Sequence, residues 1–459
     1  MRSPLPDYLA DVLDAVRSIE DGAPADYIDV LANADTSRLA VALATVDGEV
    51  YAAGDSDVAF SIQSISKPFA YAAAIEDVGL GAVLAKIGVE PSGDAFNELS
   101  LEDGSHRPMN PMINAGALAT HALVGGPDAT GPQRVERLRA LMSAMAGREL
   151  DVDEAVYAAE LRDAHRNRGL AHMLRAGGII TAEAETIVDG YVRQCAVNVT
   201  VRDLALMAAT LANAGVQPLS GRQVIDRGGV RQVLSVMTTC GMYDAAGDWV
   251  SNVGIPAKSG VAGGIIGALP GQLGLAVFSP KLDAHGNSAR GVAVCERLSR
   301  DMGLHMMDVS QIGRAVVRTL VVTLAGGKGH TDDAVVPVYE LRGAVRFGGA
   351  ELLTRALARD LGDADTADGG RHRDASAVIL SLLHTHSLND VATRMLLENL
   401  RRLHADGRTV VLVDPAGVLD LAPLDAAQRP QVVADDAGAQ TAVGGDACRI
   451  VASREDTGR

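Results

Sequence analysis

The alternation of apolar and polar positions predicts a sheet built from two β-hairpins that lie far apart in the sequence. Apolar residues 39–46 and 49–54 flank Asp47-Gly48, the turn dipeptide of a tight hairpin. Two further apolar stretches, 263–269 and 273–278, are joined by a Pro-Gly turn. The two hairpins therefore place sheet near both ends of a first region.

Helical spacing of apolar residues fills most of the chain between the hairpins, from about residue 68 to about residue 250. The segments with this spacing include Val135–Ala146, Asp153–Arg166 and Val201–Ala214, and a closing helix is predicted at Ala289–Met302. We therefore expect residues 1–305 to form an α/β domain, a mixed sheet with a helical insert. A groove should lie where these segments meet.

The rest of the chain predicts a smaller α/β module behind a linker. The linker covers residues 306–333 and contains a predicted helix at 309–322. Residues 334–428 alternate strands and helices, which indicates a sheet with helices on one side: strands at 335–341, 377–382 and 409–413, and helices at 348–361 and 391–405. Residues 429–459 lack periodicity, and we expect them to be disordered.

Composition and charge exclude several classes of partner. The 459-residue chain carries a formal net charge of -17, and only 3% of its residues are aromatic, which argues against a nucleic-acid partner. The N-terminus lacks an apolar leader segment, and no apolar stretch is long enough to span a membrane. Four widely spaced cysteines, Cys195, Cys240, Cys295 and Cys448, suit reduced thiols. We therefore expect a cytoplasmic protein without a membrane partner.

Ser64 and Lys67 form an S-x-x-K pattern, which on a helix brings a hydroxyl and an amine to one face. The amine can then take the proton of the hydroxyl, provided that burial or nearby positive charge lowers its pKa. A single S-x-x-K is expected by chance in a chain of this length and equally fits a solvated helix start. Lys258-Ser259-Gly260 adds weight, because a K-[ST]-G element accompanies S-x-x-K in serine acyl-transfer enzymes.

Five more polar residues complete a candidate site. Asn114 lies among small residues, and Glu160 and Asn167, seven positions apart, should share one face of a helix. Tyr191 and Tyr243 follow in the sequence. The histidines show no H-E-x-x-H spacing, so we expect neither a metal site nor a cofactor.

These motifs, in this order, resemble the serine-dependent bacterial glutaminases, whose fold is related to serine β-lactamases and penicillin-binding proteins. The resemblance covers about residues 8–303. It rests on five segments: Gln63–Lys67, Pro111–Gly116, Tyr191–Cys195, Gly254–Val261 and Phe278–Ser288. It implies a β-lactamase-like fold and hydrolysis of L-glutamine to L-glutamate and ammonia, and it suggests a homo-oligomer.

The resemblance also implies catalytic roles. Ser64 would be the nucleophile that forms a γ-glutamyl ester, and Lys67 the base that activates it. Tyr191 and Tyr243 would relay protons to the departing ammonia and help to hold the substrate. The segment Lys258-Ser259-Gly260 would support the site.

Substrate binding is implied for a second set of residues. Glu160 would pair with the α-ammonium group of glutamine, and the amides of Asn114 and Asn167 would bind its carboxylate or ammonium group. The backbone N–H groups of Ser64 and Val261 would form the oxyanion hole.

Residues 334–428 resemble the STAS domains, modules similar to anti-sigma-factor antagonists, which implies a regulatory or assembly role with a protein or ligand partner. Where many such domains carry a phosphorylatable serine, this chain has Asp390. The carboxylate could replace a phosphoserine or simply cap the following helix.

Two other functions fit parts of the pattern. A β-lactamase or peptidase shares the Ser-Lys pair, but the missing leader and the absence of a clear S-D-N element disfavour it. A catalytically idle protein that acts through its STAS-like module is disfavoured by the intact set of Ser, Lys and Tyr residues.

Overall fold

The computed structural model describes residues 3–92, 101–102, 104–309, 316–324, 334–362, 370–444 and 448–451. The chain divides into two units. The first consists of Pro6–Ser299 with Leu304–Met306, and the second consists of Met1–Leu5, Arg300–Gly303 and Met307–Arg459. Each unit has its own sheet.

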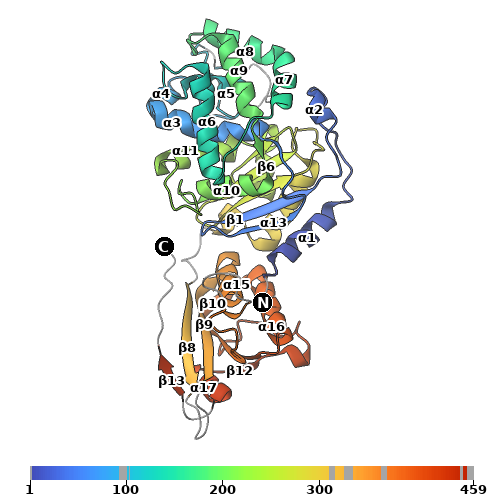
Figure 1. Cartoon of the computed structure of the whole chain (residues 1–459), viewed down its shortest axis with the longest axis vertical. Coiled ribbons are helices and arrows are strands. Elements are labelled where there is room, and N and C mark those ends of the chain that lie inside the picture. The colour runs from blue at the N-terminus through green and yellow to red at the C-terminus, as the bar shows by residue number, and fades with distance from the viewer. Residues whose placement is uncertain are drawn as a thin grey trace. The chain divides into compact units, whose positions relative to one another are not determined.

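The sheet of the first unit confirms both predicted hairpins. Its strand order is β2-β1-β7-β6-β5, and all neighbouring strands are antiparallel. The bounds are β1 Ala40–Thr45, β2 Val50–Gly54, β5 Ala257–Gly260, β6 Gly264–Leu269 and β7 Leu273–Phe278. The pairing of β1 with β7, with Leu43 opposite Leu275, joins the two distant hairpins into one sheet (Figure 1).

Helix α10, Val201–Ala212, packs closely on this sheet. The contact depends on Gly274 of β7, where an added Cβ would lie 2.2 Å from the backbone nitrogen of Ala209. Strands β1, β6 and β7 are buried along their whole length, which explains why Thr45 is their only polar residue.

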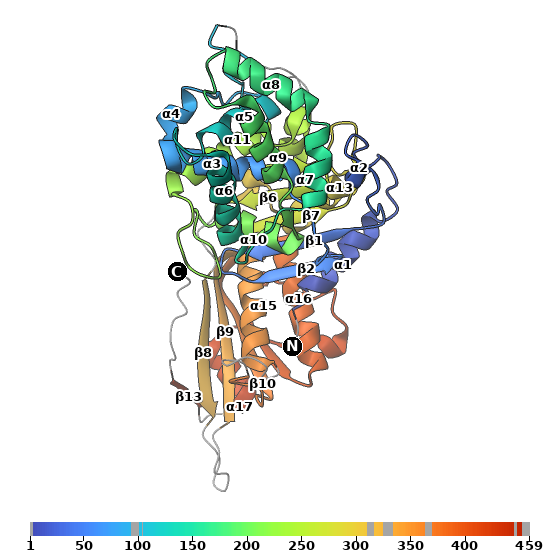
Figure 2. The ribbon, with the colours of Figure 1, turned by 45° about the horizontal axis from the view of Figure 1, so that its top comes forward.

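The helical insert gathers over one side of the sheet (Figure 2). Its helices are α3 Lys67–Val78, α4 Leu80–Leu84, α5 Asn114–Leu123, α6 Gly131–Ala146, α7 Glu154–Arg162, α8 His165–Ala176, α9 Ala184–Cys195, α11 Arg227–Cys240 and α12 Ala246–Asn252. The remaining elements of this unit are α1 Leu5–Val16, α2 Asp29–Ala32, α13 Ala289–Met302, the strand pair β3 Phe60–Ser61 and β4 Asn198–Val199, and the 3-10 turns η1 Gln63–Ser66 and η2 Tyr243–Ala245.

The single helix predicted over Asp153–Arg166 is wrong, because the segment is divided between α7 and α8. At the end of α7, the carbonyl oxygen of Leu161 accepts from the backbone N–H of Asp163 and, at 2.8 Å, from the Arg168 guanidinium. The chain turns at Asp163 and Ala164 and starts a new helix at His165.

The second unit contains a six-stranded sheet in the order β12-β11-β10-β9-β8-β13. Strands β9, β10, β11 and β12 run parallel to one another, whereas β8 pairs antiparallel with both β9 and β13. The bounds are β8 Val316–Leu324, β9 Ala334–Val345, β10 Ala377–Leu388, β11 Thr409–Val413, β12 Gln431–Val433 and β13 Cys448–Val451. The helices are α14 Met306–Val309, α15 Phe347–Leu361, α16 Asp390–Ala405 and α17 Asp436–Gly444, with a 3-10 turn η3 at Ala426–Gln428.

Three predictions for this part of the chain are wrong. The helix expected at 309–322 is replaced over 316–324 by strand β8, so the expected linker contributes a strand to the sheet. Within the tail expected to be disordered, the described residues hold β12, α17 and β13, whereas residues 445–447 and 452–459 lie outside the described ranges. Helix α17 packs on β11 through Ala439, on the face of the sheet that carries Ile379. Leu380, which is also buried, points to the opposite face. Both faces of the sheet are therefore covered, and the expectation of helices on one side only is wrong.

Asp390 is not the capping residue of α16. The side chain of Asn389 occupies the N-cap and accepts from the backbone N–H of Ala392 at 2.9 Å. Asp390 lies in the first turn, where its charge suits the positive end of the helix dipole. The resemblance of this unit to STAS domains stays a prediction.

Among the described residues, no helix combines the length and apolar character needed to cross a membrane.

Candidate active site

The Ser64 segment is a tight turn between strand β3 and helix α3. Gln63 has a left-handed backbone with φ of 50°, and Ser64 follows it inside η1 with only 7% of its surface exposed. Lys67 begins α3, and Pro68 lies in the first turn, where a missing N–H costs no helical hydrogen bond. The turn presents Ser64 at the wall of a pocket.

Lys67 is almost fully buried beside Ser64, with 1% of its surface exposed. Its Nζ donates to the carbonyl oxygen of Met112 at 3.1 Å and to Oδ1 of Asn114 at 2.7 Å. Burial lowers the pKa of Lys67 to about 8, although Cys195 and Glu160 act in the opposite direction. A substantial share of this amine is therefore neutral near pH 8.

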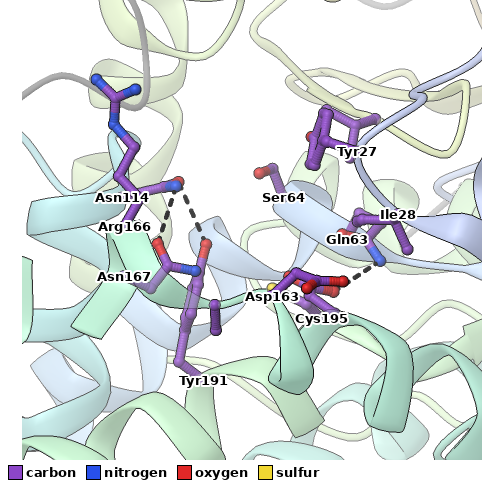
Figure 3. Close-up of a pocket in the computed structure, with 13 residues that line it drawn as sticks. Tyr27, Ile28, Gln63, Ser64, Asn114, Asp163, Arg166, Asn167, Tyr191 and Cys195 are labelled. Atoms are coloured by element: carbon purple, nitrogen blue, oxygen red, sulfur yellow. Dashed lines mark hydrogen bonds between the residues drawn. The ribbon is translucent and has the colours of Figure 1, made fainter. Parts of the chain in front are cut away.

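Asn114 links three elements of the insert. Its Oδ1 accepts from Lys67. The same oxygen accepts from the hydroxyl of Tyr191 at 3.4 Å, and Nδ2 of Asn114 donates to Oδ1 of Asn167 at 3.2 Å (Figure 3). The position of Asn114 at the start of α5 is set by Asn110, whose Oδ1 accepts from two backbone N–H groups of the preceding turn.

Glu160 and Asn167 both reach the pocket, but from two helices instead of one shared helix face. Gln63 Nε2 donates to Oε2 of Glu160 at 3.2 Å. Burial raises the pKa of Glu160 to about 7, against the opposing effects of this hydrogen bond and of Lys67. The carboxylate thus lies in a place where an added cation would stabilise its charged form.

Tyr243 and Lys258 both contact the backbone carbonyl of Ser259. Tyr243 has a left-handed backbone with φ of 57°, and its hydroxyl donates to the carbonyl oxygen of Ser259 at 3.3 Å. Burial raises the pKa of Tyr243 to about 12, while hydrogen bonds with Ser64 and Ser259 act against this shift. Lys258 Nζ donates to the same carbonyl at 2.7 Å and lies 3.9 Å from the centre of the Tyr243 ring. Burial, and then the charge of Lys67, hold the pKa of Lys258 well below its usual value.

A cavity of about 270 Å³ connects these residues. This volume is just below the range of about 300–1,000 Å³ typical of pockets for drug-sized ligands, so it suits a smaller molecule. Six predicted site residues line it: Ser64, Asn114, Glu160, Asn167, Tyr191 and Val261. Lys67 and Tyr243 do not line the cavity, but Lys67 contacts Asn114 and Tyr243 contacts Ser64, which do.

Strand β5 places the other predicted residues against the Ser64 turn. An added Cβ on Gly260 would lie 3.0 Å from the carbonyl oxygen of Ile62, so the glycine permits a close approach of β5 to the turn. Ser259 is fully buried in the same strand and supplies the carbonyl that Tyr243 and Lys258 share.

Sequence reasoning missed several residues that line the pocket: Tyr27, Ile28, Gln63, Asp163, Ala164, Arg166 and Cys195. Gln63 and Cys195 lie within two of the motif segments, and this position could have identified them as site residues. Tyr27 is 55% exposed and precedes a four-residue helix, so no sequence pattern distinguished it. Across the described ranges, no group of three or more His, Cys, Asp or Glu residues is arranged to hold a metal ion.

The antiparallel sheet, the helical insert above it and the serine-lysine turn between them are consistent with the β-lactamase-like class of fold. The chain belongs to the glutaminase family, whose family model matches residues 22–307. Its mixed α/β structure also matches solved structures of probable glutaminases, one of them with a TM-score of 0.63 and 38% identity over 67% of this chain and 99% of the other.

Known relatives agree with this assignment. The chain is 47% identical over 416 residues to a glutaminase of Corynebacterium glutamicum, covering 91% of this chain and 95% of the relative. A crystal structure of Mglu in its glutamate form matches with a TM-score of 0.66 and 46% identity, over 91% of this chain and all of the other. A glutaminase of Trichormus variabilis is 47% identical over 310 residues, which cover 68% of this chain but 92% of that relative. The protein is therefore an enzyme with glutaminase activity.

Proposed function

We propose that the enzyme hydrolyses L-glutamine through a γ-glutamyl ester on Ser64, with Lys67 as the base. The observation that carries the proposal is the buried Lys67 next to a pocket-lining serine, with its pKa lowered to about 8. A neutral lysine amine accepts the Ser64 proton while Oγ attacks the side-chain carbonyl carbon of the substrate. Lys258 is a supporting residue: burial and the charge of Lys67 lower its pKa, and its Nζ donates to the Ser259 carbonyl that also accepts from Tyr243.

The tetrahedral intermediate places negative charge on the former carbonyl oxygen. The backbone N–H groups of Ser64 and Val261, two residues that line the same cavity, are the proposed donors to this oxyanion. Each such donor typically contributes about 100- to 1,000-fold in rate.

Collapse of the intermediate breaks the carbon–nitrogen bond, and the leaving nitrogen takes a proton to depart as ammonia. Tyr243, which shares a hydrogen bond with Ser64, and Tyr191, which contacts Asn114, are the proposed proton carriers. Water then attacks the ester and releases L-glutamate and free Ser64.

Substrate selection rests on the other lining residues. The Glu160 carboxylate pairs with the α-ammonium group of glutamine, and the amides of Asn114 and Asn167 bind the backbone end of the substrate. The small cavity and the buried carboxylate together favour a short zwitterionic amide.

The deciding experiment measures ammonia and glutamate release from L-glutamine by the full chain and by Ser64→Ala. We expect the wild type to release both in equal amounts and the variant to lose more than about 1,000-fold in kcat, because the nucleophile is gone. Full activity of Ser64→Ala would exclude the serine ester. Hydrolysis of nitrocefin or asparagine in place of glutamine would redirect the choice of substrate.

For the whole protein we propose a cytoplasmic homo-oligomer whose second unit, as a STAS-like module, regulates activity or assembly. The described cysteines Cys195, Cys240 and Cys295 are free thiols, which fits a reducing compartment. The oligomer and the regulatory role rest on family resemblance alone, and size measurement by light scattering tests the first of them.

A further inference from the structure

A buried chain of side chains runs behind Ser64, and the proposed mechanism does not use it. It begins at His121 of α5, passes through Gln194 of α9 and Ser66 of η1, and ends on the backbone carbonyl of Gln63. His121, Gln194 and Ser66 each have 1% or less of their surface exposed. The three hydrogen bonds measure 3.0 Å, 3.0 Å and 2.7 Å in that order.

The donors in this chain all point the same way. The Ser66 hydroxyl donates its only proton to the carbonyl oxygen of Gln63. It accepts from Nε2 of Gln194, so Oε1 of that amide faces His121, and Nδ1 of His121 is then the donor. Hydrogen bonds aligned in one direction polarise one another, which strengthens the last bond of the series.

The carbonyl at the end of the chain belongs to the peptide unit that joins Gln63 to Ser64. No peptide bond among the described residues is cis, so this unit is planar and trans, with its N–H opposite to its C=O. A bond that fixes the carbonyl of Gln63 therefore also fixes the direction of the Ser64 N–H. The left-handed backbone of Gln63 makes this restraint important, because few residues adopt such a conformation unaided.

We propose that Ser66 is a positioning residue that aims the Ser64 N–H at the oxyanion, with Gln194 and His121 holding the Ser66 hydroxyl in place. The inference rests on the proposed function, because it requires the Ser64 N–H to serve as an oxyanion donor. Hydroxyls in helical turns often bond to a carbonyl three residues earlier. Ser66 differs because Gln194 reaches it from another helix and fixes the direction of its proton.

The packing around the chain supports a fixed arrangement. An added Cβ on Gly190 would lie 2.3 Å from Nε2 of His121, so α9 packs against the imidazole ring too closely for any side chain at this position. Cys195, the residue after Gln194 on the same helix, lies next to Ser66 as well. Helix α9 thus holds Ser66 while its Tyr191 faces the pocket (Figure 3).

The test compares Ser66→Ala with Ser299→Ala in the full chain. Ser299 is a matched control, since it is 3% exposed and donates to the backbone carbonyl of Val253 at 2.6 Å, outside the proposed site. We expect Ser66→Ala to lower kcat about 10- to 100-fold with KM within about threefold, and Ser299→Ala to leave both within about twofold.

Ligand affinities separate positioning from general damage. The probes are L-glutamate and the boronic acid analogue of glutamine, which forms a tetrahedral adduct with an active-site serine. Ser66→Ala should weaken the boronic acid about 10- to 100-fold and L-glutamate less than about threefold, because only the tetrahedral adduct uses the oxyanion hole. Equal weakening of both ligands, or an unchanged kcat, would overturn the proposal.

Two further variants complete the design. Gln194→Met keeps the side-chain length but removes the donor to Ser66. We expect it to weaken the boronic acid about 3- to 10-fold, again with little effect on L-glutamate. This variant decides the question if Ser66→Ala does not fold. Ser64→Ala tests the proposed function separately. If Ser64→Ala is inactive while Ser66→Ala and Gln194→Met behave as wild type, the serine mechanism stands and the positioning inference alone is wrong.

Discussion

At the scale of single residues, burial brings the pKa values of two oppositely charged groups close to neutral pH. Lys67 and Glu160 are held away from water, which lowers the pKa of the amine to about 8 and raises that of the carboxyl to about 7. Each partly stabilises the charge of the other, but burial outweighs this attraction in both cases. The chemistry proposed for the site requires a neutral lysine and an ionised glutamate.

The pH dependence of kcat/KM follows from these two groups. Deprotonation of Glu160 near pH 7 and of Lys67 near pH 8 both create the active form, so kcat/KM should rise with pH through this interval. Steady-state kinetics from about pH 5 to about pH 10 measure the profile. A kcat/KM that stays constant over the whole interval would contradict the assigned roles.

Glu160→Gln separates the two contributions. We expect KM for L-glutamine to rise at least about tenfold, because the α-ammonium group loses its charged partner. The remaining rise in kcat/KM should shift to lower pH, because Glu160 no longer stabilises the charged form of Lys67. An unchanged KM would place the ammonium site elsewhere.

How well the sequence predicted individual residues depended on whether they stand in a motif. Ser64, Asn114 and Tyr191 reach one cavity from separate elements, as the motif segments led us to expect. Glu160 and Asn167 were expected there because of helical spacing, yet the helix between them is interrupted. The break at Asp163 and Ala164 has no signal in the spacing of apolar residues, and it became visible only in the folded chain.

At the scale of elements, glycine positions show how closely the helices approach the site. Gly116 in α5 is buried, and an added Cβ would lie 1.8 Å from the carbonyl oxygen of Asn110. Gly169 in α8 has no atom of another segment within 4 Å of its added Cβ. The same substitution should therefore have opposite effects at these two positions.

Gly116→Ala should destabilise the protein by about 1–3 kcal/mol, because the helix must move away from the backbone that orients Asn114. Gly169→Ala should stabilise it by about 0.5–1 kcal/mol through lower backbone entropy of the unfolded chain. Thermal and urea unfolding of both variants measure the difference. If Gly116→Ala were as stable as wild type, the tight contact of α5 with Asn110 would not exist in solution.

The elements that sequence reasoning missed depend on distant partners. Strand β8 is rich in Val and pairs with β9 on one side and β13 on the other, but a helical reading of the same residues is possible in a short window. Strand β12 has only three residues and is held by its parallel pairing with β11. The spacing of apolar residues within each segment does not predict either pairing. The hairpin of β1 and β2, in contrast, is predicted by its Asp47-Gly48 turn.

At the scale of the whole molecule, catalysis and the second unit occupy different parts of the chain. Every residue proposed for catalysis or binding belongs to the first unit. The family model also ends at residue 307, close to the end of that unit. The second unit has its own buried cluster, which includes Val338, Ile379 and Val411.

A chain that ends at residue 309, after α14, should therefore retain kcat and KM for L-glutamine within about threefold of the full chain. The physical reason is that the hydrogen bonds that position Lys67, Asn114 and Glu160 all come from residues of the first unit. The relative from Trichormus variabilis, matched over 310 residues that make up 92% of its own length, is a glutaminase as well. Activity should be compared at equal protein concentration, with Ser64→Ala in the shortened chain as the background control and light scattering to record assembly. A folded shortened chain that loses more than about tenfold in kcat would show that the second unit takes part in catalysis, whereas a change in assembly alone would assign it to oligomer formation.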